Sequence, residues 1–171
     1  MEQTKNGGKF YLNTKEQVEH WDKVLDDYEH GIGIPMYSSE SFSETELQEY
    51  LTMNRDAIEK LAPEDCAQIS MRLGQFAFHI QRTLNREIAR HNWAEETIKE
   101  TIAFEINSYK GYGYLEKSIQ AIKDNEKANA LNKIKKYAKQ RMDRLGFLAN
   151  NIKNLSDILL SIQRTKVKHG T

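Results

Sequence analysis

Apolar residues recur with helical spacing along most of this chain. The most regular stretch carries five apolar residues in one row, each seven positions after the last: Leu131, Ala138, Leu145, Ile152 and Leu159. A second row lies three residues after the first, and only Arg141 interrupts it: Ile134, Leu148, Leu155 and Ile162. A seven-residue repeat stays against a neighbouring helix only when the two helices supercoil left-handedly. The pattern therefore predicts a long, coiled-coil-like helix from about Asn125 to Lys166.

A second long helix is predicted from Pro63 onwards. Proline suits the first helical position, and Glu64 and Asp65 place negative charge where the helix dipole favours it. Apolar residues then recur about every 3.6 positions as far as Tyr109. We expect one helix of about 45 residues that ends at Lys110-Gly111, because glycine readily adopts the left-handed cap conformation.

Shorter helices are predicted on either side of this long one. We expect them from Thr14 to Gly31, from Ser43 with Glu46 in a capping box, from about Asn54 to Leu61, and over 115–122, with a loop at 31–43. Helices on the order of 60 Å, at 1.5 Å per residue, favour an elongated hairpin. The predicted fold is all-α: an elongated antiparallel hairpin of two long helices with short N-terminal helices.

Charge divides the chain although its formal net charge is zero. Residues 1–62 hold 6 Lys and Arg against 13 Asp and Glu, whereas residues 63–171 hold 19 against 12. We therefore distinguish an acidic N-terminal arm, 1–62, from a basic helical hairpin, 63–171. Such a division suits a polyanionic partner for the basic part. The alternative is an ordinary solvated surface whose two parts attract each other weakly.

Catalytic and metal-binding patterns are not found in the sequence. The five histidines lack metal-ligand spacing, and the glutamates of 95–105 lack the Glu-x-x-His pairs of ferritin-like sites. The single cysteine, Cys66, fits a reducing compartment. No signal segment or long apolar run is recognisable. We expect a cytoplasmic protein that is not an enzyme and needs no cofactor or metal.

Two groups of basic residues are candidates for contact with phosphates. Arg82, Arg86 and Arg90 lie four residues apart on one face of the first long helix. The last helix adds Lys133, Lys136 and Lys139, and residues 126–171 hold 11 Lys and Arg against 3 Asp and Glu. Such faces often follow a nucleic-acid backbone. The alternatives are a salt-bridged face, with Glu87 as the nearest partner, and the solvated lysines of any coiled coil.

The segment between the long helices is rich in tyrosine and glycine. Tyr109, Lys110, Tyr112 and Tyr114 alternate with flexible residues. Unpaired bases stack on aromatic rings while lysine holds the backbone, so this segment is a candidate platform for single strands. The alternative is a tyrosine-rich turn packed against the helix ends.

The apolar rows also predict self-association, because short N-terminal helices cannot cover two stripes of this length. We expect a homo-oligomer whose interface uses six residues of the last helix: Leu145, Leu148, Ile152, Leu155, Leu159 and Ile162.

Part of the sequence resembles a known family. The run from Gln75 to Glu95 is similar to small helical proteins of tailed phages. The order of long helix, Tyr-x-Gly break and long helix ending in Ile162-Gln163-Arg164 resembles the UvsY family of phage recombination mediators. The resemblance covers about 66–169. It implies a helical, ring-forming protein that binds single-stranded DNA and loads a RecA-like recombinase onto strands coated by single-strand-binding protein.

One departure from that family bears on the site. The family places basic residues just before its tyrosine-glycine break, whereas residues 105–109 here contain none. Any DNA contacts must then involve the arginine row or the lysines of the last helix. The sequence thus favours a single-stranded DNA-binding mediator of phage recombination or replication. The alternative is a phage accessory protein that binds, blocks or scaffolds another protein without nucleic acid.

Overall fold

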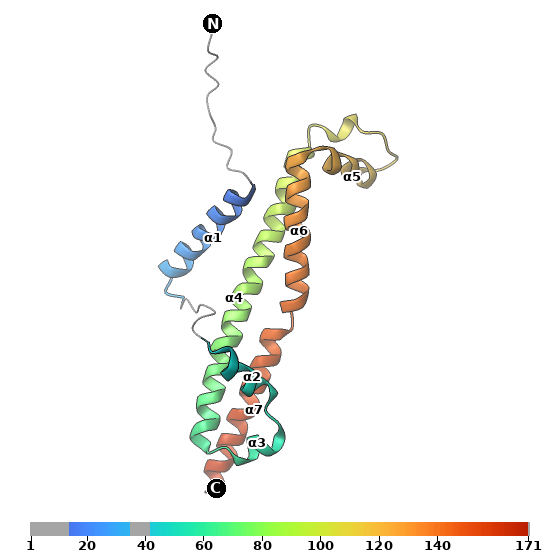
Figure 1. The fold of residues 1–171 in the computed structure, drawn as a ribbon. Coiled ribbons are helices and arrows are strands. Elements are labelled where there is room, and N and C mark those ends of the chain that lie inside the picture. Colours follow the sequence, from blue (N-terminus) through green and yellow to red (C-terminus); the bar gives the residue numbers. More distant parts are fainter. Residues whose placement is uncertain (1–13, 35–41, 171) are drawn as a thin grey trace. The chain divides into compact units, whose positions relative to one another are not determined.

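The computed structural model describes residues 14–34 and 42–170, and every regular element in these ranges is helical. The elements are α1 (Thr14–Gly31), α2 (Glu44–Thr52), α3 (Arg55–Lys60), α4 (Pro63–Ile102), the 3₁₀ turn η2 (Ile106–Ser108), α5 (Tyr114–Asp124), α6 (Glu126–Leu145) and α7 (Leu148–His169) (Figure 1). The predicted all-α class is confirmed. Residues 35–41 of the predicted loop lie outside the described ranges.

Local capping explains where the short helices begin. Ser43 accepts a hydrogen bond from the Glu46 amide at the start of α2, at 3.4 Å. Asn54 accepts one from the Ala57 amide at the start of α3, at 2.9 Å. These side chains satisfy amide groups that have no acceptor within the helix. Both starts were predicted from the sequence.

The first long helix, α4, ends at Ile102 and does not reach Lys110, so it is shorter than predicted. The chain tightens there into bonds between residues three apart: the Glu105 amide donates to Ile102 O at 3.1 Å, and the Ser108 amide to Glu105 O at 2.9 Å. The Ser108 hydroxyl also donates to Glu105 O, at 2.6 Å. Such side-chain bonds compete with helix continuation.

The predicted heptad helix is interrupted at Gly146 and Phe147, between α6 and α7. The Gly146 amide donates to Met142 O at 2.8 Å. A Cβ on Gly146 would lie 3.2 Å from the same oxygen, which is tighter than ordinary contact. Glycine therefore lets α6 end in this close turn. The prediction of one unbroken helix was wrong at this point.

The chain divides into two compact units. Of the described residues, unit 1 comprises 14–34 and 94–133, and unit 2 comprises 42–93 and 134–170. Both α4 and α6 contribute to each unit. The acidic arm predicted for residues 1–62 is a division by charge and stays a prediction.

The core of unit 2 is formed by α4 and α7. Its buried members are Ile69, Leu73, Ala77, Ile152 and Leu159, and residues of α2 and α3 pack against them. A pair of buried hydroxyls joins the two helices: Ser70 Oγ donates to Ser156 O at 2.9 Å, and Ser156 Oγ donates to Ser70 O at 2.8 Å. Each hydroxyl is thereby satisfied without water.

The paired segments of unit 2 run antiparallel. The Lys166 ammonium group donates to Leu61 O, Ser70 bonds to Ser156, and Arg141 lies beside Glu87. Partner numbers therefore fall as residue numbers rise along α4. In unit 1, α5 packs against η2, and the buried residues include Ile98, Ile102, Ile106, Ala121 and Leu131.

Candidate nucleic-acid interface

The predicted arginine row on α4 is half-buried and engaged within the protein. Arg90 donates a hydrogen bond to Glu87, three residues earlier on the same helix. Arg82, Arg86 and Arg90 also make other interactions within the protein. A phosphate bound by this row would compete with these interactions.

Glu87 is the centre of a charged cluster that also contains Arg90 and Arg141. Its side chain is only 4% exposed, and Arg141 Nε lies 2.8 Å from its Oε2. This second contact is an ion pair without hydrogen-bond alignment. A buried carboxylate is costly unless charge and hydrogen bonds compensate it. Arg141, which interrupts the second apolar row, is therefore part of this cluster.

The predicted lysines of α6 differ in how they are engaged. Lys139 pairs with Asp143 at 2.8 Å. Lys133 and Lys136 are exposed and form no ion pair within residues 14–34 and 42–170. The same holds for other basic residues of the last two helices: Lys127, Arg144, Lys153, Arg164 and Lys168. These unpaired cations, rather than Lys139 or Arg90, are open to an external anion.

The tyrosine-glycine connector is held close to the start of α5. The Tyr112 amide donates to Glu116 Oε2 at 3.0 Å, so the first turn of α5 reaches back to the connector. A Cβ on Gly111 would lie 3.2 Å from Glu116 Cβ. A side chain at position 111 would therefore require the Glu116 side chain to shift by a few tenths of an ångström. Tyr112 is fixed by its backbone bond to Glu116 while its ring stays fully exposed.

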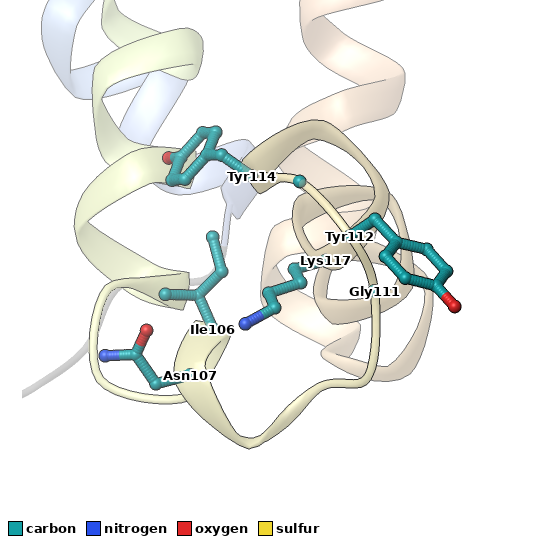
Figure 2. Close-up of a pocket in the computed structure, with 7 residues that line it drawn as sticks. Ile106, Asn107, Gly111, Tyr112, Tyr114 and Lys117 are labelled. Carbon is teal, nitrogen blue, oxygen red and sulfur yellow. The ribbon is translucent and has the colours of Figure 1, made fainter.

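A small open pocket of about 260 Å³ lies at this connector. Figure 2 shows the residues that line it: Ile106, Asn107, Gly111, Tyr112, Gly113, Tyr114 and Lys117. The Lys117 ammonium group points toward Ile106 and Asn107. The ring of Tyr112 points outward, and that of Tyr114 lies in a different direction. The connector therefore does not present its tyrosines as one stacked platform.

Tyr109 is engaged inside unit 1. Partial burial, the negative charges of Asp124 and Glu105, and a hydrogen bond to Asp124 raise the pKa of its hydroxyl above the ordinary value of 10.0. The ring is half-buried. Lys110, its neighbour, is exposed. Of the four connector residues predicted to bind nucleic acid, Tyr109 is the least open to a base.

The six residues predicted for the oligomer interface also differ in exposure. Ile152 and Leu159 are buried in the core that α7 forms with α4. Leu155 is half-buried and packs against that core, and Leu145 and Ile162 are half-buried. Leu148 is 43% exposed. Leu148 is therefore the member of this set most open to a second chain.

Sequence reasoning named Glu87 as the nearest partner of the arginine row, but it did not predict that Glu87 is buried and lies beside Arg141. Two irregularities in the pattern gave a signal for this contact: a carboxylate among helix-spaced arginines, and a lone arginine in an apolar row. Sequence reasoning also did not single out Tyr137, which is 57% exposed on α6.

We compared the chain with protein-family models, curated proteins and solved structures. None of these comparisons finds a match. Within the described ranges, no three His, Cys, Asp or Glu side chains are grouped so as to hold a metal ion. No helix there is long and apolar enough to span a bilayer.

Proposed function

We propose that this protein binds single-stranded DNA without catalysing a reaction, and that it serves as a mediator of recombination or replication. The observation that carries the proposal is a set of basic residues of unit 2 on α6 and α7 that are exposed and form no ion pair within the described ranges: Lys136, Arg144, Lys153, Arg164 and Lys168. When such cations contact the phosphates of a nucleic-acid strand, they displace the counterions condensed on it, and the release of these counterions favours binding. The exposed ring of Tyr112 adds a surface on which an unpaired base can stack.

The loading of a RecA-like recombinase onto strands coated by single-strand-binding protein belongs to the proposal through the resemblance to the UvsY family. Assembly of the protein into a homo-oligomer is also part of the proposal. In each copy, two long helices would pair as a hairpin. Both are expectations of the resemblance and the apolar pattern.

A salt-titrated binding assay tests the DNA proposal. Fluorescence anisotropy of labelled oligo(dT) should show binding at low salt that weakens steeply as salt rises. The variant Lys136→Ala with Arg144→Ala should bind more weakly and give a shallower dependence on salt, because fewer counterions are released. Lys15→Ala with Lys23→Ala is the matched control, since these exposed lysines lie on the acidic helix α1. Absence of binding to long oligo(dT) at low salt would refute the proposal.

The tyrosines of the connector are tested in the same assay. Tyr112→Ala with Tyr114→Ala should cost on the order of 1–3 kcal/mol per stacked base, with little change in salt dependence. If the tyrosine pair does not change binding to oligo(dT) while Lys136→Ala with Arg144→Ala weakens it, the connector is only a turn.

A second candidate function, binding to another protein, is favoured by exposed apolar side chains. Phe104 is 96% exposed, Phe147 78% and Leu115 71%. Apolar side chains that stay this exposed in each unit can be covered by a partner protein. The DNA assay separates the two candidates, because a protein-docking surface needs no salt-dependent binding to oligo(dT).

A further inference from the structure

One face of α6 combines a tyrosine with basic and polar residues. Lys136, Gln140 and Arg144 lie four residues apart, and Tyr137 lies three before Gln140 and seven before Arg144. Residues at these spacings share one side of a helix. All four are exposed, whereas Ala138, on the opposite side of α6, is buried. We call these four residues the α6 outer face.

The α6 outer face does not resemble a seam for another helix. Tyr137, 57% exposed, is its only aromatic or aliphatic member. The cations of Lys136 and Arg144 form no ion pair within the described part of the chain. The nearby carboxylate of Asp143 is paired with Lys139 at 2.8 Å. An apolar partner would have to desolvate two unpaired cations, which is costly.

An unpaired base with its phosphates matches this face better. Arg144 lies about 12 Å from Lys136 along the axis, at 1.5 Å rise per residue. Two phosphates of one strand can therefore contact these cations while a base lies on the ring between them. A duplex keeps its bases stacked inside and presents no free π-face to the ring.

We propose that Tyr137 is a base-stacking residue of the α6 outer face and gives this face its preference for single strands over duplex. The inference rests on the proposed function, since it assigns a residue to the selectivity of that binding. It adds a stacking site separate from the tyrosine-glycine connector.

The test compares three variants on oligo(dT) and on a duplex of equal length. Tyr137→Ala should weaken binding to oligo(dT) at least about fivefold, the lower end for one stacked base. It should leave duplex binding and the salt dependence unchanged. Tyr137→Phe should bind like the wild type, because the ring is retained. Tyr28→Ala is the matched control: Tyr28 is 64% exposed, but its neighbours on α1 are Asp26, Asp27 and Glu29.

A second readout does not depend on the alanine variant. Tyr137→Trp should add a fluorescence signal that oligo(dT) quenches by stacking, beyond the signal of Trp21 and Trp93. Any one of three results would overturn the inference. Tyr137→Ala could weaken binding to oligo(dT) and to duplex equally, Tyr137→Ala could leave binding to oligo(dT) unchanged, or oligo(dT) could fail to quench the fluorescence of Tyr137→Trp. If the wild type binds oligo(dT), and Lys136→Ala with Arg144→Ala weakens that binding but Tyr137→Ala does not, this inference fails while the proposed function stands. If the wild type does not bind, the proposed function fails with it.

Discussion

At the scale of single residues, Glu87 is the most constrained charge described in unit 2. Its carboxylate is buried between Arg90 and Arg141, so its negative charge offsets two cations from different helices. An isolated buried charge is unfavourable, but removing one member of a compensated group leaves the others unbalanced. Glu87 therefore links α4 to α6 by charge, whereas most of unit 2 is held by apolar contact.

Replacing Glu87 with Gln should lower the free energy of unfolding by about 1–3 kcal/mol, because Arg90 and Arg141 lose their counter-charge. The loss stays at this size because the Arg141 side chain is 48% exposed and solvent screens its charge. Urea denaturation followed by circular dichroism measures the change. Glu96→Gln, at an exposed position of α4, is the control and should be near neutral. Equal stability of the two variants would contradict this role of Glu87.

Tyr109 gives a prediction in alkaline solution. Its pKa is raised in the folded protein by burial and by Asp124 and Glu105, so the folded state holds the phenol proton more tightly than the unfolded state. Its contribution to stability is complete below pH 10.0 and is lost as pH rises through the folded pKa. The difference in unfolding free energy between wild type and Tyr109→Phe should therefore be flat below that pH and fall above it. A flat difference at every pH would show that Tyr109 is not engaged.

At the scale of elements, two rows of residues on α6 and α7 are buried, and the sequence predicted only the first of them. Leu131, Ala138, Ile152 and Leu159 are buried as the heptad pattern predicts. The second buried row lies three residues before this one, not three after, and its buried members are Ala128, Ala149 and Ser156. Small side chains let the helices approach closely, as the Ser70–Ser156 bonds require. Reasoning from large apolar residues favoured Leu148 and Leu155 instead.

In the candidate site too, the sequence predicted only the features that neighbouring residues along the chain decide. Helix starts depend on local capping residues, so Ser43, Asn54 and Pro63 were predictable. The exposure of Lys136 and the pairing of Lys139 with Asp143 depend on rotamers and on which face is buried. The contact between Glu87 and Arg141 depends on the register of two antiparallel helices, which the pattern along one chain does not define.

Alanine substitutions distinguish the two rows of α7. Ile152→Ala, at a buried core position, should cost about 2–5 kcal/mol of unfolding free energy. Leu148→Ala should cost less than about 1 kcal/mol, because Leu148 is already 43% exposed. Thermal or urea unfolding measures both. A larger loss for Leu148 than for Ile152 would mean that the second predicted row, and not the buried row of Ile152, holds the helices together.

At the scale of the whole molecule, apolar surface remains uncovered in both units. Helix α1 has no buried residue, and three of its large side chains are exposed by 40–64%: Trp21, Val24 and Tyr28. In unit 2, Phe147, Leu148 and Ile158 are exposed. Burial of these side chains against a second copy would remove their apolar surface from water. They support the proposal of a homo-oligomer, and the acidic α1 is suited to a basic partner surface.

Sedimentation should therefore find an oligomer at micromolar concentration. Leu148→Asp should lower the mass while the circular dichroism spectrum stays helical, because this side chain lies at the surface of its own chain. Gln163→Asp, at a half-buried polar position of α7, serves as a control for added charge. A monomeric wild type would remove the prediction.

The interruption at Gly146 and Phe147 has a consequence for backbone exchange with solvent. Phe147 provides no side-chain cap to α7, and the first amides of a helix have no acceptor within it. Deuterium should therefore replace protons quickly at Leu148, Ala149 and Asn150, between two slowly exchanging stretches. A ligand that spans α6 and α7 would slow that exchange, so this short window can report binding at a distance from the contacting side chains.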